Sequence, residues 1–163
     1  GSLNLDGLSR VGIKGAGGLT GMAVVMWLAL TLGGVTRSLG TGQYVASVVG
    51  DSVPLFALMP LVFIVTSGIA FATGSSWGTF AIMLAVAIPL SNALGQPPAP
   101  FVAAVLSGGI FGDHCSPISD TTIIASLASA TDHIEHVRTQ LPYALIAGGI
   151  AAVGFVFIGA LLP

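Results

Sequence analysis

The sequence predicts an all-α membrane protein, a polytopic bundle of transmembrane helices in one domain over residues 1–163. Only four of the 163 residues are Lys or Arg and six are Asp or Glu, while 54% are hydrophobic. The mean hydropathy is +0.99, whereas soluble domains carry about 25% charged residues. The 23 glycines and nine prolines suit helices in a bilayer, because small residues let helix backbones approach closely. The alternation of polar and apolar residues that is typical of membrane β-barrels does not recur.

Charge and cysteine content argue against several other classes of protein. The net charge of −2 gives no basic field, so we expect no nucleic-acid partner. The lipid bilayer is the expected environment, and no cofactor is predicted. The single cysteine, Cys115, excludes an internal disulfide and a zinc site with several cysteines.

The first predicted span covers residues 15–36, which carry no charge and follow Arg10 and Lys14. About 20 apolar residues are enough to cross about 30 Å of hydrocarbon. Residues 37–52 are mixed in polarity, with apolar side chains loosely at helical spacing, and predict a short interfacial helix or a linker.

Residues 53–94 are longer than one span and predict a helical hairpin. Its break is expected at residues 74–79, where glycines and small polar residues loosen a helix. The arms are either two complete spans or a re-entrant hairpin whose tip stops near the membrane midplane. Pro89 and the prolines of residues 97–100 close the second arm and begin a new element.

Residues 100–130 predict a discontinuous helix with its break at residues 113–120. Pro117 lacks a backbone donor and clashes with the carbonyl four residues earlier, so the helix should end close to Asp113 and begin again near Ser119 or Asp120. A polar turn at residues 131–138 is expected at the membrane surface, and residues 141–162 predict a final span.

Basic residues predict the orientation of this topology. Arg10, Lys14 and Arg138 would lie on one side of the membrane and Arg37 on the other. Because Lys and Arg favour the cytoplasmic side, we expect the N-terminus inside.

The strongest candidate for a functional site is the run Phe-Gly-Asp-His-Cys-Ser-Pro-Ile-Ser-Asp-Thr-Thr at residues 111–122. The 61 residues from Ser52 to Gly112 contain no Asp, Glu, Lys, Arg or His. An ionisable group at membrane depth costs about 2.5–3.5 kcal/mol and tends to mark an ion pathway. Hard cations such as Na⁺ and Ca²⁺ prefer oxygen ligands. The candidate ligands are Asp113, Ser116, Ser119, Asp120, Thr121 and Thr122.

The two carboxylates of this run can also hold a proton. Burial disfavours the charged form of a carboxylate, and a second carboxylate nearby disfavours it further. Asp113 and Asp120 are therefore expected to exchange a proton for a cation, which is the chemistry of antiport. The alternative is that these acids cap half-helices or lie in an internal loop without binding an ion.

The hairpin break carries hydroxyls from Ser75, Ser76 and Thr79. Paired discontinuous segments indicate a transporter binding site, so these hydroxyls are expected to oppose the break at residues 113–120. A structural role is equally compatible with the sequence, because hydroxyls commonly bond to membrane-helix backbones.

The three histidines are candidates for proton relay or pH sensing. They are His114, within the candidate site, and His133 and His136, in the expected polar turn, where a simple solvated loop is the alternative. Neither a Cys-His nucleophile nor a zinc site is expected at His114 and Cys115, since zinc usually takes four ligands. We therefore expect a transporter and not an enzyme.

These motifs resemble the NhaC family of Na⁺/H⁺ antiporters. The resemblance rests on residues 111–122, on Gly-Ser-Ser-Trp-Gly-Thr-Phe at 74–80 and on Asp-His-Ile-Glu-His-Val-Arg-Thr-Gln-Leu-Pro-Tyr at 132–143. It implies an ion-transporter fold of two inverted repeats, each with a hairpin and a broken helix. The chain resembles the second, C-terminal repeat alone, so a second copy or a missing N-terminal repeat is expected to complete the site.

The resemblance implies a secondary active transporter in a prokaryotic cytoplasmic membrane, which exchanges Na⁺ for H⁺ by alternating access. It assigns the cation and proton site to Asp113, Asp120 and the hydroxyls between and beside them, and the opposing polar tip to residues 75–79. Some relatives couple Na⁺ and H⁺ to organic anions such as malate and lactate, which gives a first alternative. A membrane scaffold or subunit without transport activity is a second.

Overall fold

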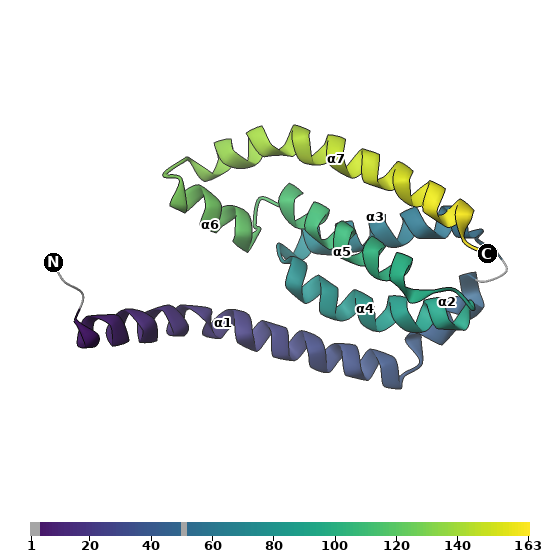
Figure 1. The fold of residues 1–163 in the computed structure, drawn as a ribbon, viewed down its shortest axis with the longest axis horizontal. Helices are drawn as coiled ribbons and strands as arrows, with labels where there is room; N and C mark the ends of the chain where they lie inside the picture. Colours follow the sequence, from purple (N-terminus) through teal and green to yellow (C-terminus); the bar gives the residue numbers. More distant parts are fainter. Residues whose placement is uncertain (1–3, 50–51) are drawn as a thin grey trace.

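The computed structural model describes residues 4–49 and 52–163. These residues form a bundle of helices in which α1 lies along one side and α7 along the other, with α3, α4 and α5 between them (Figure 1). The all-α membrane bundle predicted from the sequence is confirmed. The helices are α1 (Leu5–Ser38), α2 (Thr41–Val49), α3 (Leu55–Thr73), α4 (Ser76–Ala93), α5 (Pro98–Cys115), α6 (Asp120–Ala128) and α7 (His133–Leu161).

Helix α1 is longer than the span expected at residues 15–36. It begins after Asn4, whose side-chain oxygen accepts a hydrogen bond from the backbone N–H of Gly7 at 2.8 Å, so an N-cap starts the helix ahead of the apolar stretch. Gly40, with a φ of 67°, separates α1 from α2. Helix α2 occupies most of the stretch 37–52, of which residues 50 and 51 lie outside the described part.

Helices α3 and α4 form the hairpin. The turn between them occupies only Gly74 and Ser75, because residues 76–79 form the first turn of α4 rather than extending the break. Gly74 caps α3 in the left-handed conformation, with a φ of 65°, which a residue without a Cβ adopts at little cost. By length and composition α3, α4 and α7 are each able to cross a membrane.

Helices α5 and α6 form the discontinuous helix and are bent by 53° relative to each other. The break is narrower than the expected 113–120: α5 continues through Cys115, and α6 begins at Asp120. Ser116 has an extended backbone, with a ψ of 128°, because the residue before a proline avoids the helical conformation. Pro117 therefore lies beyond the last turn of α5, and Asp113 remains helical.

The polar segment expected as a turn at residues 131–138 is mostly helical. Asp132 caps α7, its carboxylate accepting a hydrogen bond from the backbone N–H of Glu135 at 3.0 Å. This cap starts the helix at His133, eight positions before the expected final span, and the turn shrinks to residues 129–132.

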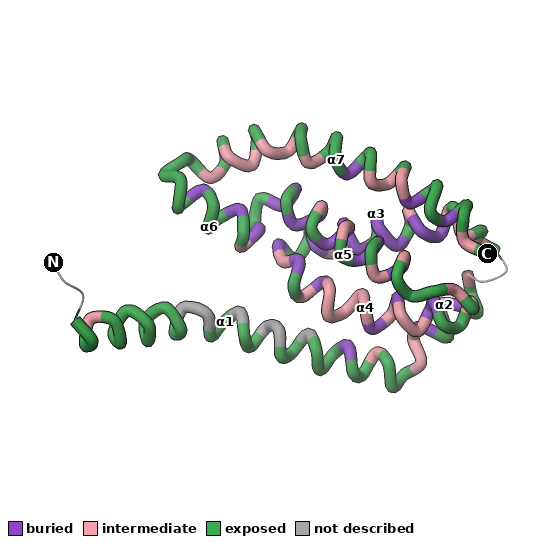
Figure 2. Tube along the Cα trace, viewed as in Figure 1, coloured by how far each residue is buried: buried purple, intermediate pink, exposed green. Residues whose placement is uncertain are grey.

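The core lies where α3 packs against α5. Phe63 of α3 and Phe101 and Val105 of α5 are almost fully buried, and buried positions follow both helices in Figure 2. An added Cβ at Gly108 or Gly112 would collide with backbone carbonyls of α3, so these glycines allow the two backbones to touch. Large apolar side chains on α7 face outward, as expected of a surface in contact with lipid.

Candidate cation site at the break between α5 and α6

Asp113 is the most deeply buried acidic side chain of the candidate site. It lies in the last turn of α5 and is only 2% exposed. The preceding residue, Gly112, packs against the backbone carbonyl of Ser67 in α3. This contact presses the end of α5 against α3 and places the carboxyl group inside the bundle.

Hydroxyl groups of the break form a chain that ends on this carboxyl group. Thr121 donates to Oδ2 of Asp113 at 2.7 Å, and the hydroxyls of Ser119 and Thr121 lie 2.9 Å apart. Because the single hydrogen of Thr121 is used on Asp113, Ser119 is the donor to Thr121. Ser119 also caps α6, accepting from the backbone N–H of Thr122 at 3.2 Å. These hydrogen bonds hold the side chain of Asp113 against the start of α6.

One oxygen of each carboxyl group in the break lacks a hydrogen-bond partner within residues 4–49 and 52–163. Oδ1 of Asp113 and Oδ1 of Asp120 are buried and accept no hydrogen bond from the described residues. A buried polar atom without a partner is uncommon and requires an explanation, such as a bound ion. A cation or a proton would supply the missing partner to both oxygens.

The two breaks of the chain meet. The backbone N–H of Asp120 donates to the carbonyl of Gly74 at 3.2 Å, and the Ser116 hydroxyl donates to the carbonyl of Phe71 at 2.8 Å. Gly74 also packs against the carbonyl of Ile118, leaving no space for a Cβ. The C-terminal end of α3 thus lies directly against the start of α6.

The hydrogen bonds between the two breaks end on the carbonyls of Phe71 and Gly74 and not on the predicted polar tip at residues 75–79. Thr79 is buried and donates to the carbonyl of Ser75 at 2.8 Å, and its hydroxyl lies 3.4 Å from that of Thr73. Ser76 is buried and Ser75 half-buried. Sequence reasoning selected these hydroxyls and missed the carbonyls of Phe71 and Gly74, although Gly74 is recognisable as a left-handed helix cap.

The histidines lie in different surroundings. His114 is exposed on α5, its Nδ1 lies 2.9 Å from the carbonyl of Ile110, and it lines a cavity of about 340 Å³ between α5 and α7. His133, the first residue of α7, contacts the break directly: Nε2 lies 2.7 Å from the carbonyl of Pro117.

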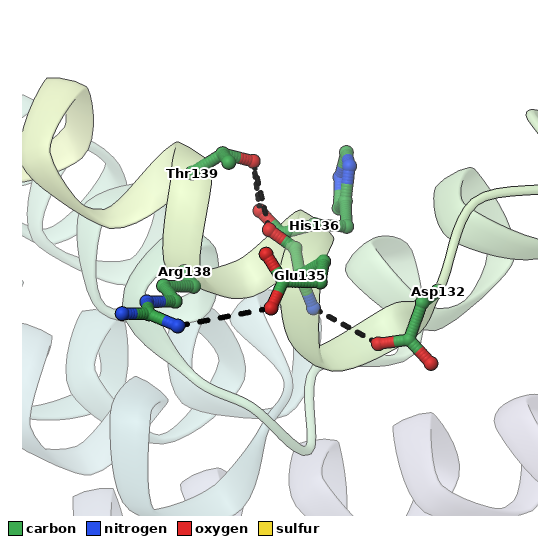
Figure 3. A network of polar contacts seen from close by, with 5 residues as sticks. All are labelled: Asp132, Glu135, His136, Arg138 and Thr139. Carbon is green, nitrogen blue, oxygen red and sulfur yellow. Dashed lines mark hydrogen bonds and ion pairs between the residues drawn. The ribbon is translucent and has the colours of Figure 1, made fainter.

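His136 lies one turn further along α7, beside an exposed pair of opposite charges. Figure 3 shows its ring standing apart from the ion pair of Arg138 and Glu135, whose closest charged atoms are 3.8 Å apart. Thr139 donates to the backbone carbonyl of His136 at 3.0 Å. Exposed pairs of this kind add little to stability.

Comparison with known proteins relates the chain to transporters. The profile of a family described as the Na⁺/H⁺ antiporter family matches residues 1–160. An uncharacterized protein of Haemophilus influenzae is 39% identical over 150 residues, which are 91% of this chain and 28% of that protein. The malate-2H⁺/Na⁺-lactate antiporter of Bacillus subtilis is 35% identical over 139 residues, 85% of this chain and 28% of the relative.

The Na⁺/H⁺ antiporter NhaC of Alkalihalophilus pseudofirmus is 30% identical over 160 residues, 97% of this chain and 32% of the relative. The chain thus spans about three-tenths of the length of these relatives. No solved structure matches.

Proposed function

The chain belongs to the Na⁺/H⁺ antiporter family, and on this premise we propose that it is part of a secondary transporter that exchanges Na⁺ for H⁺ by alternating access. The resemblance to NhaC that the motifs predicted is confirmed. The apolar helices and the family identify an integral membrane protein.

The proposal rests on two buried carboxylate oxygens that accept no hydrogen bond from the part of the chain that the structure describes. Oδ1 of Asp113 lies at the end of α5 and Oδ1 of Asp120 at the start of α6. Both are hard oxygen donors, which suit Na⁺. Na⁺ and a proton each carry one positive charge and compete for these oxygens, so one proton takes the place of one Na⁺ when the ion leaves.

The hydrogen bond from Thr121 orients the carboxyl group of Asp113 for this exchange. It occupies Oδ2 and leaves Oδ1 for the ion or the proton. Since Thr121 belongs to α6 and Asp113 to α5, the same bond holds the two halves of the broken helix in register. Preorganised oxygens of this kind bind an ion without first having to reorient.

We propose that a second copy of the chain or an N-terminal repeat completes the site. Thr121 is exposed and Asp120 only half-buried, so the break is covered on the side of α3 and open on another side. A further set of helices against that open side would enclose the ion. We also propose a prokaryotic cytoplasmic membrane with the N-terminus inside, since Arg10, Lys14 and Arg138 favour the cytoplasmic side.

The test is the replacement of Asp113 by Asn in the chain reconstituted into proteoliposomes. Asp113→Asn keeps the size of the side chain but can neither bind a proton nor neutralise Na⁺, so Na⁺-dependent proton flux and Na⁺-dependent thermal stabilisation should both disappear. Asp132→Asn is the matched control, because Asp132 is an exposed acid that caps α7 and Asn is an equally good cap. Full activity of Asp113→Asn would refute the assignment.

A second reading comes from the relative in Bacillus subtilis that is named as a malate-2H⁺/Na⁺-lactate antiporter. In this reading an organic anion accompanies Na⁺, and malate or lactate should alter Na⁺-driven flux in the wild-type chain. If neither malate nor lactate changes the Na⁺-driven flux, the result would favour simple Na⁺/H⁺ exchange over exchange with an organic anion. A strictly monomeric chain without any cation-dependent thermal shift would instead favour a scaffold or subunit.

A further inference from the structure

We propose that His133 is a positioning residue that holds the break between α5 and α6 in the geometry that the cation site requires, an inference that rests on the proposed function. Its ring joins two parts of the broken helix to the start of α7. Nε2 lies 2.7 Å from the carbonyl of Pro117, and Nδ1 lies 3.2 Å from the hydroxyl of Ser126. Pro117 lies in the break and Ser126 near the end of α6, so one side chain contacts the break and α6 at the same time.

The donors of these contacts follow from the chemistry of the partners. The carbonyl of Pro117 can only accept, so Nε2 carries a hydrogen. Ser126 has one hydrogen and two acceptors for it, Nδ1 of His133 and the carbonyl of Ile123 at 2.9 Å. When the ring is neutral, the Ser126 hydroxyl donates to Nδ1. When the ring is charged, Nδ1 donates to the Ser126 oxygen, and the Ser126 hydroxyl donates to the carbonyl of Ile123. Both contacts therefore persist in either protonation state, which fits a fixed brace better than a pH sensor.

His133 binds the break at Pro117, a residue whose backbone offers one polar group. Pro117 has no N–H, so its carbonyl is the only backbone polar group through which it can be held. Ser116 and Ser119 flank it, and both are candidate ligands. Two contacts within the break are long: the Ser119 N–H lies 3.3 Å from the Ser116 carbonyl, and the Ile118 N–H lies 3.4 Å from the Ser116 hydroxyl. Among the described residues, the bond from His133 is the one hydrogen bond that joins residues 116–119 to α7.

The backbone that carries the ring is held by a helix cap. Asp132 caps the first turn of α7 through the N–H of Glu135, and His133 follows directly. One turn further on, the ring of His136 makes no hydrogen bond to the other residues drawn in Figure 3. The two histidines share a helix and a chemical type, and only His133 reaches the break, so His136 serves as a matched control.

The experiment compares His133→Ala, His133→Gln and His136→Ala in the purified chain. Hydrogen exchange reports how well the amides of residues 116–123 are protected, and a Na⁺ titration by calorimetry gives the half-saturating concentration. His133→Ala should speed exchange in this segment and raise the half-saturating Na⁺ concentration, each about fivefold or more, as expected for a lost hydrogen bond. His133→Gln should recover most of both, because its carboxamide N–H can donate to the carbonyl of Pro117. His136→Ala should match the wild type.

The outcomes separate the brace from the proposed function. Faster exchange in His133→Ala with unchanged Na⁺ affinity would mean that His133 is only structural, and it would overturn the positioning role alone. A wild-type chain that binds no Na⁺ would overturn the proposed function and this role together. If His133→Ala does not fold, Ser126→Ala removes the Nδ1 contact together with the local bond to the carbonyl of Ile123, leaves the Nε2 contact in place, and should give a smaller change in the same direction. Wild-type exchange and affinity in Ser126→Ala would then count against the brace.

Discussion

Replacement of Gly74 by Ala tests whether the contact between the two breaks is essential to the fold. Gly74 has a φ of 65°, and an added Cβ would lie 2.8 Å from the carbonyl carbon of Ile118 and closer still to its oxygen. Two effects therefore lower the free energy of unfolding of this variant. The left-handed conformation costs about 1–2 kcal/mol for a residue with a Cβ, and the overpacking costs about 1–3 kcal/mol.

Gly95 is the internal control for this prediction. Its φ is 68°, close to that of Gly74, but an added Cβ would meet nothing within 4 Å. Gly95→Ala should therefore pay only the conformational cost of about 1–2 kcal/mol. Any effect of alanine on the unfolded chain is shared by both variants, so the difference between them isolates the contact with Ile118.

The assay is unfolding in mixed detergent micelles, followed by the loss of helical circular dichroism. We expect Gly74→Ala to lower the free energy of unfolding by about 2–5 kcal/mol, and by about 1–3 kcal/mol more than Gly95→Ala does. Because the carbonyl of Gly74 also accepts the N–H of Asp120, Na⁺ binding should weaken in Gly74→Ala and not in Gly95→Ala. Equal destabilisation of the two variants would refute the close approach of the breaks.

Three further predictions concern single contacts. Gly112→Ala should destabilise the bundle by about 1–3 kcal/mol in the same unfolding assay, because its Cβ would meet the carbonyl of Ser67; a neutral effect would argue against the packing of α5 on α3. Asp132→Ala should cost about 1 kcal/mol through loss of the α7 cap, and an unchanged unfolding midpoint would contradict that cap. Thr121→Val should weaken Na⁺ binding about fivefold by calorimetry, since the carboxyl group of Asp113 loses its fixed orientation; wild-type affinity would show that the bond is dispensable.

Local chemistry made the two interruptions predictable from the sequence. Pro117 cannot continue a helix, and Gly74 is a typical left-handed cap. Both effects act within a few residues, so they can be read without knowledge of the tertiary structure. The predicted helix boundaries were wrong where hydropathy alone was used. The caps Asn4 and Asp132 begin helices well ahead of the apolar stretches.

The partners of the candidate site could not be predicted in the same way. The bonds from Ser116 to Phe71 and from His133 to Pro117 join residues 45 and 16 positions apart. Such pairs depend on how α3, α6 and α7 pack, which periodicity does not reveal. Sequence reasoning therefore identified the hydroxyls of the hairpin tip but not the carbonyls that meet the second break. The ion ligands themselves remain a prediction.

The glycines of α5 restrict where this protein can move. Gly108 and Gly112 lie against the carbonyls of Phe63 and Ser67, so any sliding of α5 along α3 would drive a bulkier neighbouring side chain into the α3 backbone. Helices α3 and α5 should therefore move as one rigid unit. Rearrangement during a transport cycle would then fall to α6 and the adjoining end of α7, and a covalent crosslink between α3 and α5 should leave turnover intact.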